Sequence, residues 1–391
     1  MKIKTLALLG STGSIGHSTL EVVRKTKRFK VVLIIANSNY LKIISQIKEF
    51  KPKVTIINDL QIYLKIRKLN KFKKFIILNN IDTIEKYFKK IDFTVSAIPG
   101  IAGLKPTLYF VKFSKKILLA NKESIVCGWN LIKKEAKKYK TQLIPIDSEH
   151  FSISELTKRY KNQDIEKIYI TASGGPFLKL DKNKFKNIKP EDAVKHPKWK
   201  MGKKISVDSA TLMNKVLELI EAVKLFSFDF DKYEILIHPQ SLVHAIVKLK
   251  NGITYFLYHQ PDMKIPISNA LLEGKFEYSK FFKNENSKKF MSQNLEFYPV
   301  DRSKFTTLNI ISKIDINNSS PIIINAANEI FVDAFLKKNI DFSDIFTYLN
   351  IVSKHKSYIK TSKMHSNSIN NIYKIDSWAR NLALKIIKVK S

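Results

Sequence analysis

A stretch near the middle of the chain carries an amide, a cation and a carboxylate at helical spacing. Asn214, Lys215 and Glu218 stand at positions i, i+1 and i+4 of a predicted helix, roughly on one face. Such a trio can bind a phosphate and a metal ion at once, because amide and ammonium groups donate hydrogen bonds and a carboxylate ligates hard cations. The alternative is a solvated helix face.

Two further acids stand close together in Asp147-Ser148-Glu149, after the apolar stretch 143–146. In extended backbone, residues two apart face the same side, so Asp147 and Glu149 are expected to reach one cation. A hard divalent ion such as Mg²⁺ or Mn²⁺ uses a few carboxylates together with water and substrate. A plain surface pair is the alternative, although acids are scarce in this chain.

Glycines recur every third residue directly after the first predicted strand. Gly10, Gly13 and Gly16 form a G-x-x-G-x-x-G pattern that enters a predicted helix. Such a loop lets the backbone approach a phosphate, which then meets the free N–H groups of the helix N-terminus. The pattern therefore favours a dinucleotide site over an ordinary βα turn.

The segment after the second predicted strand bears on which dinucleotide is bound. Residues 36–39 read Ala-Asn-Ser-Asn and contain no acid, whereas an acid at this place favours NAD. The missing acid favours NADP over NAD. No Arg or Lys stands there either, so the sequence does not settle the preference.

Two other polar segments follow apolar strands. Residues 120–124 (Ala-Asn-Lys-Glu-Ser) are expected at the carboxyl end of the sheet, where ligands of open α/β folds bind, or else at a helix start with a solvated Lys–Glu pair. Residues 171–176 enter a loop in which Ser173 suits an anion and Gly-Gly-Pro suits a hinge. If Trp199 and Met201 lie on that loop they could cover an aromatic ring, and otherwise they pack in a core.

The elements that position these groups divide the chain. In the first 150 residues, short apolar strands alternate with helical patterns such as 18–26 and 40–50, which predicts a doubly wound parallel sheet. The predicted strands are 3–9, 31–36, 54–58, 75–78, 93–97 and 116–120.

The second half changes character. Strands at 167–172, 234–239, 245–250 and 254–258 and a helix at 213–225 predict a mixed second sheet. Residues 283–294 are polar and are interpreted as a linker. From about 306 onward the pattern is helical, most clearly at 323–337 and 375–389.

Composition excludes several classes of protein. The 69 Lys and Arg against 34 Asp and Glu give a net charge of +35, but the lysines are scattered, which favours solvated surface over a nucleic-acid site. No apolar run approaches the ~18 residues of a membrane span, and a predicted strand at Ile3 leaves no room for a signal peptide. One cysteine, Cys127, excludes intramolecular disulfides. We therefore expect a cytoplasmic protein with neither nucleic-acid nor membrane partners.

Taken together, the motifs resemble the 1-deoxy-D-xylulose 5-phosphate reductoisomerase family. The stretches GSTGSIG, ANKES, DSEH, ASGGPF, HPKWKMGKKISVDSATLMNK and IHPQSLVHA occur in that family's order and span residues 10–245. The resemblance implies a Rossmann-like NADPH-binding domain at 1–147 and a central α+β catalytic domain at 148–282 with dimer contacts. It further implies a linker at 283–305 and a C-terminal helical bundle at 306–391.

The same resemblance implies an activity. A homodimeric enzyme of isoprenoid precursor biosynthesis would convert a small phosphorylated sugar, 1-deoxy-D-xylulose 5-phosphate, to 2-C-methyl-D-erythritol 4-phosphate. It would use NADPH and Mg²⁺ or Mn²⁺, with Co²⁺ as a further candidate. The metal would act as a Lewis acid during the rearrangement, and the nicotinamide would supply the hydride.

Residue roles are carried over by motif. The implied metal ligands are Asp147, Glu149 and Glu218, and the implied catalytic residues add Lys122 and His196. The implied substrate contacts are Lys122, Ser148, Glu149, Ser173, His196, Ser209, Asn214, Lys215 and Glu218. The implied NADPH contacts are Thr12, Gly13, Ser14, Ile15, Asn37, Ser38, Asn39, Asn121, Glu123 and Gly202.

Two departures from the family pattern and two rival functions remain. Ser38 stands where a basic residue is common, and Val216 where a small one is. A simple NAD(P)-dependent dehydrogenase would need no three-carboxylate metal site. A basic nucleic-acid-binding protein would need aromatic and basic residues interleaved on one face.

Overall fold

The computed structural model describes residues 3–199, 201–282 and 293–390. The chain forms two compact units. The first comprises the described residues of Met1–Ser124, Ile132–Asp147 and Met263–Met291, and the second those of Ile125–Leu131, Ser148–Asp262 and Ser292–Ser391. Most of the predicted linker, residues 283–292, lies outside the described residues.

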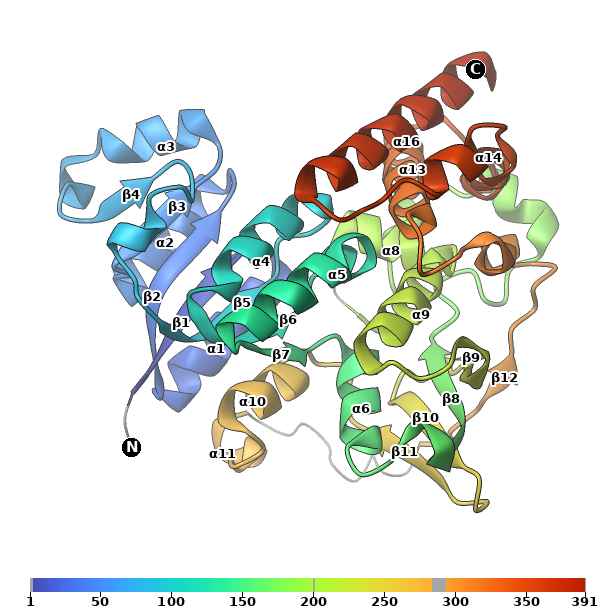
Figure 1. Ribbon diagram of the computed structural model, residues 1–391, viewed down its shortest axis with the longest axis horizontal. Coiled ribbons are helices and arrows are strands. Elements are labelled where there is room, and N and C mark those ends of the chain that lie inside the picture. Colours follow the sequence, from blue (N-terminus) through green and yellow to red (C-terminus); the bar gives the residue numbers. More distant parts are fainter. Residues whose placement is uncertain (1–2, 200, 283–292, 391) are drawn as a thin grey trace. The chain divides into compact units, whose positions relative to one another are not determined.

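The first unit is built on a seven-stranded sheet in the order β4-β3-β2-β1-β5-β6-β7 (Figure 1). Every neighbouring pair of strands is parallel, which confirms the predicted doubly wound sheet. The strands are β1 (Lys4–Leu9), β2 (Phe29–Ala36), β3 (Val54–Ile57), β4 (Ile76–Leu78), β5 (Ile91–Ser96), β6 (Ser114–Leu119) and β7 (Gln142–Pro145).

Hydrophobic cores lie on both faces of this sheet. Leu6 and Leu8 of β1 belong to one core, and the alternate residues Ala7 and Leu9 belong to the other, as expected for a strand buried on both sides. The helices of this unit are α1 (Ser14–Thr26), α2 (Tyr40–Phe50), α3 (Leu60–Arg67), α4 (Leu104–Val111), α10 (Lys264–Leu272) and α11 (Tyr278–Phe281). Helix α5 (Lys122–Tyr139) begins and ends in this unit, with Ile125–Leu131 assigned to the second.

The strand order reverses at β1, which has β2 on one side and β5 on the other. The crevice at the carboxyl end of the strands at such a switch point is where open α/β sheets bind ligands. The glycine loop that follows Leu9 therefore begins at the place where a dinucleotide is expected.

The second unit contains a five-stranded mixed sheet in the order β11-β10-β8-β9-β12. Only β8 and β9 run parallel; the other pairs are antiparallel. The strands are β8 (Ile165–Ala172), β9 (Tyr233–Ile237), β10 (Val243–Leu249), β11 (Thr254–Tyr258) and β12 (Tyr298–Pro299). The mixed sheet was predicted, except for the short edge strand β12.

Helices cover this sheet and form the C-terminal part of the chain. In α9, every residue from Met213 to Ala222 is buried, although the segment includes Asn, Lys and Glu. The C-terminal helix α13 is also buried along most of its length and packs on α14, α16 and α8. The bounds are α6 (Ser148–Thr157), α7 (Pro190–Ala193), α8 (Lys203–Ala210), α9 (Met213–Phe226), α13 (Ser320–Leu336), α14 (Phe342–Lys354), α15 (Tyr358–Ser362) and α16 (Ile369–Lys390).

One local prediction is wrong. Residues 147–149 are not an extended segment, because β7 ends at Pro145 and α6 begins at Ser148. Glu149 therefore lies in the first turn of a helix. None of the helices within residues 3–199, 201–282 and 293–390 is long and apolar enough to cross a bilayer.

Candidate active site

Two carboxylates that adjoin the start of α6 come together with a third from α9. One ligand oxygen each from Asp147, Glu149 and Glu218 lies within 4.8 Å of the others. Asp147 directly precedes α6, Glu149 lies in its first turn, and Glu218 comes from the middle of α9. Their side chains are 14%, 12% and 1% exposed, so this is not the surface pair that was considered as an alternative.

The face of α9 predicted from sequence also takes part. Lys215 Nζ donates hydrogen bonds to Glu149 Oε1 and to Glu218 Oε2. Asn214 Nδ2 donates to the other oxygen of Glu218. The predicted trio is thus a buried network and not a solvated helix face.

Lys215 keeps its charge in this buried position. Burial opposes the ammonium ion, but Glu149 and Glu218 outweigh burial and raise the pKa of Lys215. Together with Lys122, which lies beside Asp147, Lys215 is one of two ammonium groups among three carboxylates, so the carboxylates outnumber these two cations.

Two further neighbours contact the carboxylates. Lys122 Nζ lies 3.3 Å from Asp147 Oδ2, and both side chains are largely buried. Ser148 Oγ donates to Glu149 Oε2. Glu123 accepts from the side chain of Asn121 at 2.8 Å. Lys122 and Glu123 are both buried, so they are not the solvated pair that was the alternative.

His196 and Ser173, both in the second unit, form another polar pair. His196 Nδ1 accepts from the backbone N–H groups of Lys198 and Trp199, at 3.1 and 2.9 Å, so the ring proton of the neutral form lies on Nε2. His196 Nε2 is 2.9 Å from Ser173 Oγ and donates to it. Burial and the nearby Lys215 ammonium lower the pKa of His196 to about 4, so the ring is neutral near pH 7.

The Gly-Gly-Pro loop packs directly against α8. Gly174 and Gly175 both have positive φ, and a Cβ on Gly175 would come within 2.9 Å of Ala210 Cα and 3.0 Å of the Ser209 carbonyl oxygen. Only glycine allows this approach. The loop therefore brings Ser173 to the C-terminal end of α8, where Ser209 lies.

The turn between α8 and α9 is unusual. Leu212 has φ of 59°, a left-handed conformation that costs a non-glycine residue about 1 kcal/mol or more, and it is nevertheless buried. This turn joins Ser209 at the end of α8 to Asn214 and Lys215 at the start of α9. Packing thus imposes the turn that connects the end of α8 to the start of α9.

The glycine loop of the first unit has the predicted form. Gly10 has φ of 88°, and a Cβ there would lie 2.5 Å from the Ala97 carbonyl oxygen. Gly13 and Ser14 are exposed at the start of α1, whose first turn receives no capping hydrogen bond from a described side chain. The Gly13 N–H donates to the Gly10 carbonyl oxygen at 3.2 Å, so the N–H groups of the first turn of α1 are the ones that fit a dinucleotide pyrophosphate.

The remaining predicted cofactor residues are placed as follows. Asn37, Ser38 and Asn39 are exposed between β2 and α2. Asn121 caps α5 by accepting from the Ser124 N–H at 2.8 Å. Gly202 belongs to the second unit, at the N-terminus of α8.

Sequence reasoning missed the residues that support α9. His150, fully buried on α6, has Nε2 2.9 Å from the Glu218 carbonyl oxygen and Nδ1 3.4 Å from Glu221. Asp208 of α8 accepts from Asn328 of α13 at 2.7 Å. Glu221 could have been found from the sequence, because it is an acid about one turn after Glu218 on the same predicted helix. The Asp208–Asn328 contact joins residues 120 positions apart, so the local sequence gave no signal for it.

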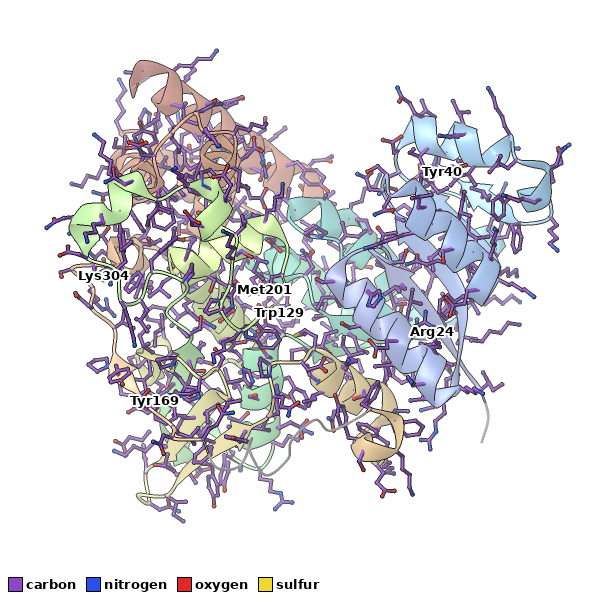
Figure 2. The ribbon with its side chains drawn as sticks, turned by 180° about the vertical axis from the view of Figure 1, so that it is seen from behind. Arg24, Tyr40, Trp129, Tyr169, Met201 and Lys304 are labelled. Carbon is purple, nitrogen blue, oxygen red and sulfur yellow. The ribbon has the colours of Figure 1, made fainter. Side chains whose placement is uncertain are left out.

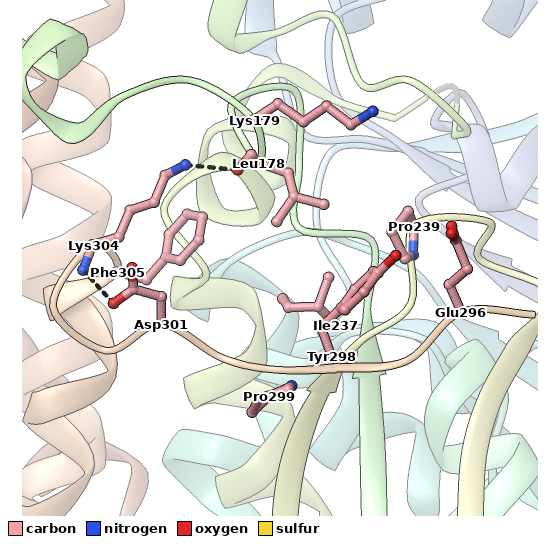
Figure 3. Close-up of a pocket in the computed structure, with 10 residues that line it drawn as sticks. All are labelled: Leu178, Lys179, Ile237, Pro239, Glu296, Tyr298, Pro299, Asp301, Lys304 and Phe305. Atoms are coloured by element: carbon pink, nitrogen blue, oxygen red, sulfur yellow. Dashed lines mark hydrogen bonds between the residues drawn. The ribbon is translucent and has the colours of Figure 1, made fainter.

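A cavity of about 400 Å³ lies elsewhere in the second unit (Figure 3). Leu178 and Lys179 line one side of it and Tyr298 of β12 another. Lys304 Nζ donates to the Leu178 carbonyl oxygen at 2.6 Å and so ties residues 300–305 to the segment that follows the Gly-Gly-Pro loop. None of the predicted site residues lines this cavity.

A glycine loop at the switch point of a doubly wound sheet, together with a buried cluster of oxygen ligands, defines a dinucleotide-dependent enzyme with a site for a hard metal ion. The sequence profile of 1-deoxy-D-xylulose 5-phosphate reductoisomerase matches residues 6–128, and two profiles of that enzyme's C-terminal domains match residues 143–226 and 259–382. The chain belongs to the 1-deoxy-D-xylulose 5-phosphate reductoisomerase family.

Individual relatives match along almost the whole chain. The 1-deoxy-D-xylulose 5-phosphate reductoisomerase of Pelagibacter ubique (strain HTCC1062) is 44% identical over 389 residues, covering 98% of this chain and 99% of the relative. That of Wolbachia pipientis wMel is 39% identical, with 99% of each chain covered.

Solved structures agree with these matches. A crystal structure of DOX-P reductoisomerase in complex with NADPH, fosmidomycin and magnesium has a TM-score of 0.89 at 33% identity, covering 99% of this chain and 98% of that one. The Zymomonas mobilis enzyme in complex with NADPH has a TM-score of 0.87 at 34% identity, with 99% of each chain covered.

Proposed function

We infer that this chain is an NADPH- and divalent-metal-dependent enzyme that converts 1-deoxy-D-xylulose 5-phosphate to 2-C-methyl-D-erythritol 4-phosphate in isoprenoid precursor biosynthesis. The observation that carries this inference is the convergence of Asp147, Glu149 and Glu218 in a chain of this family. A solved relative is a complex with NADPH, fosmidomycin and magnesium. In this chain the glycine loop suits NADPH, and the three carboxylates suit magnesium.

The carboxylates are proposed as the metal ligands. Their oxygen donors suit Mg²⁺ or Mn²⁺, with Co²⁺ as a further candidate. A metal bound there supplies Lewis-acid stabilisation of negative charge on substrate oxygens. Lys122 and Ser148, which already contact Asp147 and Glu149, are proposed to hydrogen-bond the hydroxyl and carbonyl groups of the substrate.

Four polar side chains are proposed to bind the substrate phosphate. Ser173 and Ser209 lie on segments that touch through Gly175, and Asn214 and Lys215 follow after the Leu212 turn. These groups donate hydrogen bonds, and Lys215 adds a charge. His196 is proposed to act as a hydrogen-bond donor beside the reacting carbon atoms of the substrate. Its pKa is lowered to about 4, so the ring is neutral, and its proton lies on Nε2.

NADPH binding is assigned to the glycine loop and its neighbours. The N–H groups of Thr12–Ile15 would hold the pyrophosphate, and residues 37–39 would lie beside the adenosine ribose. Asn121, Glu123 and Gly202 complete the proposed set. The implied division into residues 1–147, 148–282, 283–305 and 306–391 is kept as a proposal, with the nucleotide bound by the first segment and the metal and substrate by the second.

A homodimer is proposed from the exposed edge of the second sheet. The strand β11 is the last of its sheet, and Tyr255 and Phe256 on it are 40% and 50% exposed. An apolar edge strand of this kind is a surface that can pair with a second chain.

A cytoplasmic location is proposed from composition, because the single cysteine allows no intramolecular disulfide.

The test of the function is an assay of NADPH oxidation with 1-deoxy-D-xylulose 5-phosphate and Mg²⁺, with and without EDTA, in which the product is identified by NMR. We expect turnover that EDTA abolishes and Mg²⁺ or Mn²⁺ restores, and a product with a branched carbon skeleton. An unbranched product, or turnover insensitive to EDTA, would show a simple dehydrogenase instead.

A further inference from the structure

The segment between β2 and α2 offers no cation for the 2′-phosphate that distinguishes NADPH from NADH. Asn37, Ser38 and Asn39 are polar, uncharged and exposed. In dinucleotide-binding sheets the adenosine ribose lies at the end of the second strand, and a nearby basic side chain accommodates the 2′-phosphate. A cation for this place must therefore come from another part of the fold.

Lys42, in the first turn of α2, reaches this place. Its backbone N–H donates to Asn39 Oδ1 at 3.1 Å, which caps the helix. Its ammonium Nζ lies 3.3 Å from the carbonyl oxygen of Thr12 in the glycine loop. Helical side chains point back toward the N-terminus, so Lys42 extends from α2 over residues 37–39 to the loop that follows β1.

The ammonium of Lys42 is not committed to a carboxylate. Among residues 3–199, 201–282 and 293–390, Lys42 forms no ion pair, and its side chain is exposed. The acids on the neighbouring elements are engaged elsewhere. Glu49 binds Arg24, Glu21 binds Lys264, and Asp59 caps α3 by accepting from the Ile62 N–H.

A second cation stands nearby on α3. Lys65 Nζ lies 4.5 Å from the ring centre of Tyr40, the first residue of α2, which Figure 2 labels. The Lys65 ammonium lies against the Tyr40 ring, whereas the Lys42 ammonium makes one long hydrogen bond, to a neutral carbonyl, with the part of the chain that the structure describes. Exchanging that bond for one to a doubly charged phosphate is favourable, because hydrogen bonds between ionised groups are about twice as strong.

We propose that Lys42 binds the 2′-phosphate of NADPH and sets the preference of this chain for NADPH over NADH, in place of the cation that residues 36–39 lack. The proposal rests on the assignment of NADPH to the glycine loop. It makes Lys42 a specificity-determining residue with no part in the rearrangement or in hydride transfer.

The test compares Lys42→Ala with Lys48→Ala. Lys48 is also exposed, lies near the other end of α2, and its substitution makes the same change in charge. The dissociation constants of NADPH and NADH are measured by fluorescence without substrate or metal. We expect Lys42→Ala to weaken NADPH about 10- to 100-fold and to leave NADH unchanged. Lys48→Ala should leave both unchanged. Adenosine 2′,5′-bisphosphate should lose affinity in parallel with NADPH, whereas 5′-AMP should not.

The outcomes separate this proposal from the cofactor assignment. Unchanged NADPH affinity in Lys42→Ala would overturn the role of Lys42 alone. Equal weakening of NADPH and NADH would overturn it as well, because Lys42 would then only support the loop through Thr12. A parental chain that bound neither dinucleotide would instead overturn the assignment of the glycine loop itself.

Discussion

Lys215 Nζ on α9 donates a hydrogen bond to Glu149 Oε1 in the first turn of α6, although the two residues are 66 positions apart. The contact joins the residues proposed to bind the phosphate to those proposed to bind the metal. Since Lys215 also donates to Glu218, a single ammonium contacts two of the three clustered carboxylates. Changes at this cluster are therefore expected to affect the two proposed binding functions differently, depending on the residue.

Glu218→Gln is expected to lower kcat by at least about 10³-fold, because it removes one negative charge from the proposed ligand set and leaves the shape of the side chain intact. The dissociation constant of NADPH should not change. Binding of Mn²⁺ alone, followed by electron paramagnetic resonance, should weaken as well. Glu155→Gln, exposed on α6, is the matched control. Near-parental activity of Glu218→Gln under Mg²⁺ would contradict the metal assignment.

Ser209→Ala is expected to raise KM for the phosphorylated substrate about tenfold with little change in kcat, because a donor to a charged group is lost. Steady-state kinetics with 1-deoxy-D-xylulose, which lacks the phosphate, provide the control. With that substrate, the parental and variant enzymes should have the same kcat/KM. A defect of the same size on both substrates would place Ser209 away from the phosphate.

Because of the buried His259, we expect the folded chain to lose stability in acid. Burial lowers its pKa to about 4, and its Nδ1 already pairs with the Gln260 carbonyl oxygen. The unfolded chain, with a pKa near 6.5, takes up a proton between about pH 6.5 and pH 4 that the folded chain does not. The free energy of unfolding should therefore fall as the pH falls through this range, by up to about 3 kcal/mol from this group.

The measurement is urea unfolding of the parental chain and of His259→Gln at a series of pH values. The variant should show a shallower loss of stability below about pH 6.5. An identical pH dependence in both proteins would assign the acid sensitivity to other groups, of which His196, with its pKa also lowered to about 4, is the next candidate.

Asn328→Leu is expected to destabilise the fold by about 1–3 kcal/mol, because it removes the amide that donates to the buried Asp208 carboxylate. Denaturant unfolding measures the loss, and a double-mutant cycle with Asp208→Asn isolates the pair. The cost of Asn328→Leu should shrink in the Asp208→Asn background. A cost of the same size in both backgrounds would mean that Asn328 acts through packing alone.

Phe256→Glu is expected to shift the chain from dimer toward monomer in sedimentation velocity, because a charge on the exposed edge strand opposes its pairing. Leu64→Glu provides the control, since Leu64 is similarly exposed but lies on α3 of the other unit. A parental chain that sediments as a monomer, or a dimer that survives the substitution, would remove β11 from the proposed interface.

The sequence predicted those features that depend on local pattern. Helix α2 and strand β11 run over the predicted residues 40–50 and 254–258, because apolar spacing and flanking polar residues mark their ends. The shared face of Asn214, Lys215 and Glu218 followed from helical periodicity and is confirmed by their hydrogen bonds.

Features set by distant packing were not predictable in this way. Asp147 and Glu149 were expected to converge through extended backbone, whereas a helix that starts at Ser148 carries Glu149, and α9 supplies the third carboxylate. The Asp208–Asn328 bond and the edge strand β12 likewise depend on contacts between segments far apart in sequence, which local periodicity does not encode.

Helix α10 has a consequence for the order in which the molecule can be completed during synthesis. Ile267 and Leu271 are fully buried in the same core as Leu6 and Leu8 of β1. The ribosome has therefore made most of the polypeptide before α10 can cover this face of the N-terminal sheet. Until then the apolar surface of that face stays exposed to solvent and to chaperones. A fragment that stops at residue 147 would carry the same gap permanently.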